Sequence, residues 1–194
     1  MSAVVASIVE GIGETKALPI LIRRVAHADE VFDVKTIEPF RRHRSDFRDI
    51  KKLVETARFL ANGDPRPTGL VILADADRDC PKHFGEHLRP ALETAVPGIH
   101  VGIVLAKEEY EAWFLASLVS LRGVKGVLAT ATPPADAEAI AGAKEHLKTN
   151  IDTRTYSPAI DQAGFTQAFA FDEAEACRSF RKCRKEIRRA LGLL

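Results

Sequence analysis

Several features that would assign this chain to a familiar class are scarce or missing. Its 194 residues include only three cysteines, Cys80, Cys177 and Cys183, which are too few and too scattered for a disulfide framework or a zinc cluster. The sequence therefore predicts a reducing, cytoplasmic location. The apolar N-terminal stretch has no basic leader, and no apolar run is long enough to cross a bilayer. We expect neither a signal peptide nor contact with a membrane.

Two common catalytic motifs and a strong net charge are also missing. The sequences Gly-Lys-Ser and Gly-Lys-Thr do not occur, which excludes a phosphate loop of the ATPase kind. The six histidines show no paired ligand spacing such as His-Glu-x-x-His. The 28 basic and 27 acidic residues nearly cancel, so the charge of the whole chain does not indicate a nucleic-acid partner.

The chain does contain strand-like stretches that alternate with helix-like ones. Apolar runs over residues 4–9, 69–74 and 99–106 are typical of buried strands, and residues 31–37 alternate like a strand near a sheet edge. Helices are expected over residues 15–26, from Ser45 as the N-cap to Asn62-Gly63, and over 109–121, 135–148 and 172–191. This alternation predicts an α/β fold. We expect one compact domain, with a core over residues 1–121 and a helical extension over 122–194 packed on it.

The densest acidic motif directly follows one of the expected strands. Residues 75–79 read Asp-Ala-Asp-Arg-Asp. Side chains two residues apart on an extended backbone point the same way, so Asp75 and Asp77 can converge just beyond the strand. Carboxylates this close repel one another, and a hard divalent cation such as Mg²⁺ or Mn²⁺ removes that repulsion. The motif therefore predicts metal ligands at Asp75 and Asp77.

A second acidic pair stands at an equivalent place on the first expected strand. Glu10 ends that strand and Glu14 begins the next helix, with a Gly-Ile-Gly turn between them. In a parallel sheet these residues reach the same carboxyl edge as Asp75 and Asp77, where open α/β sheets place their sites. We therefore expect all four as metal ligands. The alternative is that Glu14 only complements the helix dipole and that Glu10 is a solvated strand end.

Three further acids form a second tier of candidates. Asp79 is also expected to cap the helix that begins near Pro81, since proline suits a first helical position. Glu109 and Glu111 follow the fourth expected strand, which brings them to the same edge of the sheet. Trp113, in the same segment, is expected in the hydrophobic core.

Two basic segments are candidates for holding the phosphates of a nucleic acid. One is a loop near residue 42, and the other is a face of the last expected helix. A charged helix face is by default only solvated, but a carboxylate site for phosphodiesters needs such a surface. The candidates are Arg41, Arg42, Arg44, Arg181, Lys182 and Lys185.

Taken together, these motifs resemble a known bacterial family. That family is known as domain of unknown function 4276 and is grouped with the Toprim superfamily. The similar segments are Val9-Glu10-Gly11-x-Gly13-Glu14, Asp75-x-Asp77 and Glu109-Tyr110-Glu111-Ala112-Trp113, followed by Tyr156-Ser157-Pro158 with Asp161-Gln162, and Arg178-Ser179-Phe180. The resemblance covers nearly the whole chain.

The resemblance implies both a fold and a chemistry. It implies a Toprim-like, Rossmann-like three-layer sandwich with a mainly parallel four-stranded sheet and extra C-terminal helices. Toprim domains, as in topoisomerases, primases and OLD-family nucleases, bind magnesium through a Glu after the first strand and an Asp-x-Asp after a later one. Carried over, Glu10 is the general acid or base or a metal ligand, Asp75 and Asp77 are the metal-binding pair, and Glu14 is the second glutamate of OLD-like nucleases.

OLD-like nucleases also have a downstream lysine that helps to stabilise the transition state. Lys148 is the expected counterpart, with Lys144 as the second choice. OLD proteins join the Toprim domain to an ATPase that this chain lacks, so the resemblance implies an ATPase partner in trans. The expected function is Mg²⁺-dependent hydrolysis of phosphodiesters in DNA or RNA by two metal ions about 4 Å apart.

The sequence is also consistent with two other functions. One is a Toprim-like binding module that holds a partner protein or nucleic acid and cleaves nothing. The other is an aspartyl-phosphate phosphatase, because such enzymes also place Asp-x-Asp after a strand and use the first Asp, here Asp75, as the nucleophile. That class usually carries the pair on its first strand, followed by Thr or Val.

Overall fold

The computed structural model of the chain describes residues 3–77, 79–152 and 155–194. The strands are β1 (Ala3–Val9), β2 (Val34–Thr36), β3 (Phe40–Arg41), β4 (Gly69–Asp75) and β5 (His100–Ala106). They form a five-stranded sheet in the order β2-β1-β4-β5, with β3 also paired to β1. Each of these pairings is parallel. The sheet has one strand more than expected, because the segment after β2 adds the two-residue β3.

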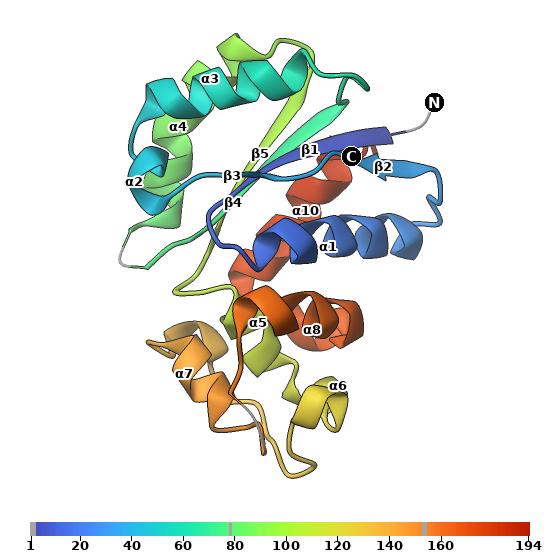
Figure 1. Cartoon of the computed structure of the whole chain (residues 1–194), viewed down its shortest axis with the longest axis vertical. Helices are drawn as coiled ribbons and strands as arrows, with labels where there is room; N and C mark the ends of the chain where they lie inside the picture. Colours follow the sequence, from blue (N-terminus) through green and yellow to red (C-terminus); the bar gives the residue numbers. More distant parts are fainter. Residues whose placement is uncertain (1–2, 78, 153–154) are drawn as a thin grey trace.

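Helices cover both faces of the sheet, so the expected three-layer α/β sandwich is confirmed (Figure 1). No described helix is both long and apolar enough to cross a membrane. The helices up to residue 121 are α1 (Glu14–Ala28), α2 (Arg44–Phe47), α3 (Ile50–Ala61), α4 (Pro81–Ala95), α5 (Glu111–Ala116) and α6 (Leu118–Leu121). Those that follow are η1 (Val124–Gly126), η2 (Ala137–Ala139), α7 (Ala143–Lys148), η3 (Pro158–Gln162), α8 (Ala163–Ala168), α9 (Phe171–Ala174) and α10 (Arg178–Ala190).

Alternation of side chains along the strands builds two hydrophobic cores. In β4, Val71 and Leu73 face the layer that contains α1 and α10. Leu70 and Ile72 face the opposite layer, which contains α3 and α4. Because a parallel sheet carries helices on both faces, both sets of side chains are buried. This explains why the central strands appear in the sequence as continuous apolar runs.

The last helix lies directly on the sheet at two glycines. A Cβ atom added to Gly69 would lie 2.5 Å from the backbone oxygen of Ala190, and one added to Gly102 would lie 2.8 Å from the Cβ of Glu186. The helix α10 packs on β5 and β4. The division at residue 121 stays a prediction, but the residues after it do not form a separate layer, since α10 completes the sandwich.

The helix expected to begin at Ser45 is in fact two helices. The short α2 covers Arg44–Phe47, and α3 begins at Ile50. Asp49 is the N-cap of α3, because its carboxylate accepts hydrogen bonds from the backbone N–H groups of Lys51 (3.0 Å) and Lys52 (3.4 Å). The prediction that Ser45 caps this helix is therefore wrong. The break between the two helices leaves Arg44 at the edge of the sheet.

The helices α5, α6, α7 and α8 lie beyond the carboxyl ends of the strands. In Figure 1 the strands end toward the lower left, and α5, α6, α7 and α8 lie below them. Aromatic rings hold this group together: Phe114 lies 5.4 Å from Phe165 between ring centroids, and Phe165 lies 5.7 Å from Tyr156. The helix α8 packs on α1, and α5 packs on α7. This packing brings α7 and η3 toward the acidic strand ends.

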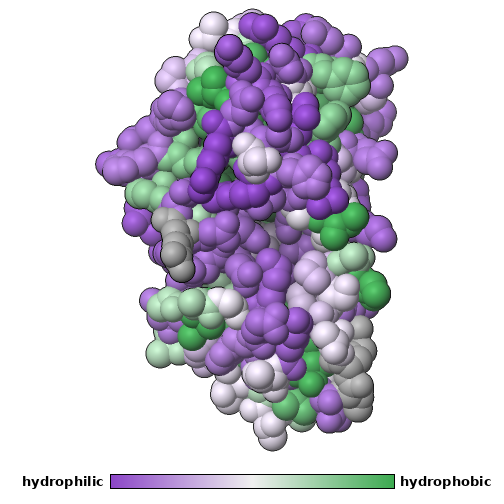
Figure 2. All heavy atoms as spheres, turned by 60° about the vertical axis from the view of Figure 1, so that its left-hand side comes forward, coloured by the Kyte–Doolittle hydropathy of each residue, from purple (hydrophilic) through white to green (hydrophobic). Residues whose placement is uncertain are grey.

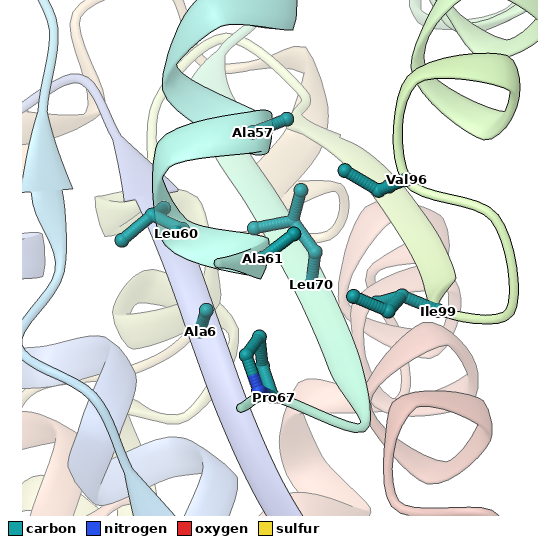
Figure 3. A pocket seen from close by; sticks show the side chains of 8 residues that line it. All are labelled: Ala6, Ala57, Leu60, Ala61, Pro67, Leu70, Val96 and Ile99. Carbon is teal, nitrogen blue, oxygen red and sulfur yellow. The ribbon is translucent and has the colours of Figure 1, made fainter. Parts of the chain in front are cut away.

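A small apolar gap lies between α3 and the sheet (Figure 3). It offers no space for a water molecule, so it belongs to the packed core and is not a binding site. Its lining residues are Ala6, Ala57, Leu60, Ala61, Pro67, Leu70, Val96 and Ile99.

Candidate functional site

The carboxyl ends of β1, β4 and β5 carry most of the acids that the sequence singled out. Five of them are buried or half-buried there, and each of the five either affects the ionisation of another or shares the ammonium group of Lys144. We call these five acids the carboxylate cluster. They are Glu10, Glu14, Asp75, Glu109 and Glu111.

Asp75 lies at the centre of the carboxylate cluster. Its Oδ1 accepts a hydrogen bond from the backbone N–H of Tyr110 (2.8 Å), and its Oδ2 lies 3.2 Å from the Nζ of Lys144. Its side chain is only 18% exposed, and burial raises its pKa above the ordinary value although Lys144 opposes this. The charge of Asp75 in turn raises the pKa values of Glu10 and Glu14. Asp75 is therefore close enough to repel both glutamates.

Glu14 is buried at the start of α1 in a space that two glycines leave open. Its carboxylate accepts hydrogen bonds from the backbone N–H of Gly11 and from the Nε2 of Gln162 (3.1 Å). A Cβ on Gly11 would lie 2.5 Å from Glu14 Oε2, and one on Gly13 would collide with Gln162. Burial, and then the charge of Asp75, raises the pKa of Glu14 to about 7. Glu14 is therefore more than a solvated acid that complements the helix dipole.

Arg44 lies between Glu10 and the loop that follows β4. Its Nη1 is 3.4 Å from Glu10 Oε2, its Nε is 3.5 Å from Asp77 Oδ2, and its Nη2 is 2.6 Å from Asp79 Oδ2. The guanidinium also donates to the backbone oxygens of Asp75 (2.6 Å) and of the next residue (3.2 Å). Burial raises the pKa of Glu10, while Arg44 acts in the opposite direction. Arg44 is thus an internal partner of the acids, with a side chain only 22% exposed.

These ion pairs change the expected roles of Asp77 and Asp79. Asp77 is 58% exposed and pairs with Arg44, so it lies at the exposed margin of the carboxylate cluster, although its charge still raises the pKa of Glu10. Asp79 pairs with Arg44 and with Arg48 (3.5 Å), whereas the N-cap residue of α4 is Cys80. The prediction that Asp79 caps α4 is therefore wrong. The physical reason is that a hydrogen bond between two charged groups is stronger than one to a neutral backbone N–H.

Two non-glycine residues beside Asp75 have a left-handed backbone. The φ angles are 47° at Asp77 and 58° at Glu108, a conformation that costs about 1–2 kcal/mol per residue. A hydrogen bond from the backbone N–H of Asp77 to the backbone oxygen of Glu108 (3.1 Å) links the two loops. Strain of this kind persists only where surrounding contacts maintain it, and it is concentrated at functional sites.

Lys144 reaches the cluster from the first turn of α7. Its ammonium nitrogen lies 3.2 Å from Asp75 Oδ2, 3.2 Å from Glu109 Oε1 and 3.6 Å from Glu111 Oε2. Its backbone N–H also donates to Glu109 (2.7 Å). Burial alone would lower the pKa of Lys144, but Asp75, Glu111 and Glu109 together raise it above its ordinary value. Lys144 is therefore a permanent positive charge within the cluster.

Glu111 is the most deeply buried acid of the cluster. Its side chain is 0% exposed, and its Oε1 accepts a hydrogen bond from the hydroxyl of Tyr156 (2.8 Å). Its Oε2 has no hydrogen-bond partner among the described residues. Burial raises the pKa of Glu111 to about 8, with the charge of Asp75 acting in the same direction and Lys144 opposing it. Glu111 is consequently protonated for the most part at neutral pH.

Lys148, the first choice for a catalytic lysine, lies outside the cluster. Its Nζ pairs with Glu145 (2.7 Å), whose side chain is mostly exposed. Residues four apart share a helix face, but Lys148 lies about 6 Å farther along α7 than Lys144. The structure therefore favours the second choice, Lys144, as the lysine of the site.

The loop arginines beside Arg44 do not point into the cluster. The Nε of Arg41 donates to the backbone oxygen of Glu10 (3.1 Å), and Arg42 donates to the hydroxyl of Thr56 (2.9 and 2.7 Å). The face of the molecule that carries α2, α3 and α4 is mostly hydrophilic, with small separate apolar patches (Figure 2). Binding of nucleic acid by these arginines stays a prediction.

The basic candidates on α10 differ from one another in their surroundings. Arg181 donates to the backbone oxygen of Glu175, and Lys182 pairs with Glu186. Lys185 is exposed. Of the three, Lys182 alone lines the cleft beside β5.

The cluster matches a hard divalent cation in the type of its donors, which are all carboxylate oxygens. Within residues 3–77, 79–152 and 155–194, however, no three acidic, histidine or cysteine side chains are placed to hold a metal ion. Lys144 and Arg44 lie against several of the carboxylate oxygens instead. A cation would be held by Glu10, Glu14 and Asp75 only where these ion pairs open.

The residue patterns alone gave no role to Gln162 or Tyr156, which contact Glu14 and Glu111. Both belong to segments that the sequence singled out only through the family resemblance. Neither segment lies near a strand end, so reasoning from the sheet edge could not reach them.

Fold and site together define a class: a three-layer α/β domain with a carboxylate cluster and a buried lysine at the carboxyl edge of its parallel sheet. Residues 9–188 match the family described as Domain of unknown function (DUF4276). Because the match spans most of the chain, the protein belongs to this family. No curated protein and no solved structure matches the chain.

Proposed function

We propose that this protein is a metal-dependent phosphodiester hydrolase that acts on DNA or RNA. One observation supports the proposal most. Glu10, Glu14 and Asp75 reach the same partly buried place from the ends of two strands, burial raises the pKa of each, and the charge of Asp75 raises those of both glutamates further. Such crowding costs free energy in the folded protein, and perturbed acids of this kind are concentrated at functional sites.

The residues of the site suit distinct roles in such a reaction. Glu10, Glu14 and Asp75 would hold Mg²⁺ or Mn²⁺, which, when bound, polarises the phosphodiester and activates water. One of the two glutamates would accept a proton from that water, as general-base catalysis requires a carboxylate within reach of it. Lys144 would turn its charge from the carboxylates to the phosphate oxygens.

We also propose that the family is related to the Toprim domains of OLD-family nucleases. Two features support this relation. The glutamates of the first motif and Asp75 of the second approach one edge of a parallel sheet, and Lys144 joins them from a later helix. The chain has no phosphate loop for ATP, so an ATPase partner would act in trans.

The direct test is a nuclease assay on single-stranded DNA, double-stranded DNA and RNA with Mg²⁺ or Mn²⁺. The wild type is compared with Asp75→Asn, Glu14→Gln and Lys144→Met, which preserve side-chain size. We expect each variant to lose activity by about 100-fold or more, the typical loss when one charge-stabilising group is removed from an active site. Glu55→Gln, on the exposed side of α3, is the matched control and should keep full activity.

Melting curves for each variant show whether a loss of activity is caused by unfolding. The proposal fails if the three variants cleave as fast as the wild type. It also fails if the wild type cleaves none of the three nucleic acids, alone or with an added ATPase partner.

The ion pairs of Arg44 and Lys144 favour a second candidate, a binding module without catalysis. In that case the two cations are permanent partners of the carboxylates, as they are in the structure. Metal titration separates the two candidates. A hydrolase should melt at a higher temperature with Mn²⁺, because a ligand at 100 times its Kd stabilises the folded state by about 2.7 kcal/mol. A binding module should show no shift.

The phosphatase alternative gains no support from the geometry. It requires Asp75 as a free nucleophile, whereas both of its carboxylate oxygens are engaged, one by Tyr110 and one by Lys144.

A further inference from the structure

A cleft of about 580 Å³ lies along the outer side of β5, away from β4. This volume falls within the range of small-molecule sites, about 300–1,000 Å³. The strand β5 ends the order of the described sheet, and α4 and α10 lie on opposite faces of that sheet, so they form the walls. Ile103 and Leu105 of β5 give the cleft an apolar floor.

The walls of the cleft carry more positive than negative charge. Its cations are Lys82 and Arg89 on α4, Arg178 and Lys182 on α10, and Lys107 just after β5. A phosphate that enters the cleft can accept charge-assisted hydrogen bonds from these cations.

The two acids of the cleft already have partners. Glu138 accepts hydrogen bonds from the backbone N–H groups of Arg178 and Ser179, both at 2.8 Å, so it caps α10. Glu86 lies 3.9 Å from the ammonium of Lys82. Carboxylates outside the cleft also pair with three of its cations: Glu93 with Arg89 (3.1 Å), Glu108 with Lys107 (2.6 Å) and Glu186 with Lys182. These three cations are partly exposed, and ion pairs of exposed side chains contribute at most about 1 kcal/mol, so a phosphate group can replace the carboxylates.

We propose that this cleft binds a phosphorylated nucleoside, either free or as part of a nucleic-acid strand. The phosphates would contact the cations of α4 and α10, and the base would lie on Ile103 and Leu105. Inorganic phosphate would gain nothing from an apolar floor, whereas a base is a flat apolar body attached to an anionic group. This inference goes beyond the proposed hydrolase, because binding here requires neither a metal nor the carboxylate cluster.

Gly85 provides a test that changes the shape of the cleft without changing its charge. It lies in α4 on the cleft wall, and a Cβ added there meets no atom within 4 Å. Gly85→Ala should bind as the wild type does. Gly85→Phe should fill the cleft and weaken binding by about tenfold or more, and neither variant should melt at a lower temperature, because both replace a helical glycine.

Binding is measured by calorimetry with ATP, adenosine and inorganic phosphate, and by fluorescence anisotropy with a labelled single-stranded decanucleotide, all in EDTA. Binding of ATP but not the decanucleotide identifies a free nucleotide as the ligand, and the reverse identifies a strand. If neither binds, the proposal is wrong. It is also wrong if inorganic phosphate binds as tightly as ATP, or if Gly85→Phe binds as well as Gly85→Ala.

A matched pair of double variants tests the charges. Arg178→Gln with Lys182→Gln removes two cations from the cleft, and Arg181→Gln with Lys185→Gln removes two from the same helix outside it. We expect about tenfold weaker binding for the first pair and little change for the second. Equal weakening would assign binding to the charge of the whole helix and overturn the proposal. Asp75→Asn should lose cleavage yet keep this binding, which separates the two proposals.

Discussion

Replacing Glu111 with glutamine should change how the stability of the protein depends on pH. Burial raises the pKa of Glu111 from 4.5 to about 8. Between these values the folded chain keeps a proton that the unfolded chain has released, so the free energy of unfolding falls as the pH rises. Each pKa unit corresponds to about 1.4 kcal/mol. Across the interval from 4.5 to about 8, the ionisation of Glu111 therefore lowers the free energy of unfolding by about 5 kcal/mol.

Urea unfolding at pH 5 and pH 8 measures the effect. Glutamine resembles the protonated acid in size and charge, so Glu111→Gln should unfold near the wild-type free energy at pH 5. At pH 8 the variant should be more stable than the wild type by several kcal/mol, because it has no charge to bury. Glu55→Gln, a change at an exposed acid, is the control and should follow the wild type at both pH values.

An identical pH dependence for the wild type and Glu111→Gln would refute this reasoning. It would mean that Glu111 ionises as an ordinary carboxylic acid in the folded protein. Part of the dependence should persist in the variant, because burial also raises the pKa of Glu14, to about 7, and its contribution has the same sign.

Three further predictions concern packing, an ion pair and a helix cap. Gly69→Ala should lower the free energy of unfolding by about 1–3 kcal/mol, because the new methyl group meets the backbone of Ala190; urea unfolding measures this. Arg44→Gln removes the ion pair to Asp79, so amide hydrogen exchange in the loop after β4 should accelerate about tenfold while β4 keeps its protection. Glu138→Ala removes the acceptor at the start of α10 and should cost about 1 kcal/mol in thermal unfolding.

A specific outcome would contradict each of these three predictions. An unchanged unfolding midpoint for Gly69→Ala would place α10 farther from the sheet than the structure does. Unchanged exchange in Arg44→Gln would mean that the guanidinium does not hold the loop. Wild-type melting of Glu138→Ala would mean that water satisfies the first N–H groups of α10 equally well.

Much of the fold follows from local patterns in the sequence. The apolar runs of β1, β4 and β5 are long enough, and apolar enough on both faces, to indicate buried parallel strands. Acids directly after them identify the carboxyl edge of the sheet. The helix ends were harder to predict. Ser45 and Asp49 are both suitable N-cap residues, and the choice between them depends on where the chain leaves the sheet.

The exact membership of the carboxylate cluster was decided by tertiary structure. Asp77 has the spacing of a metal ligand, but its side chain is mostly exposed and pairs with Arg44. Lys144 and Lys148 lie one turn apart on the same expected helix, so the sequence cannot distinguish them. Only the position of α7 shows that Lys144 is the one that reaches Asp75.

The sequence by itself determined the α/β class, the parallel strands and the edge at which the acids gather, because these depend on which residues are apolar along a short stretch of backbone. Tertiary structure decided the partners of those acids, since Lys144 follows Asp75 by 69 residues and Gln162 follows Glu14 by 148. Contacts over such separations depend on how the helices after β5 pack together. That packing is a property of the whole core, and no local pattern in the sequence determines it.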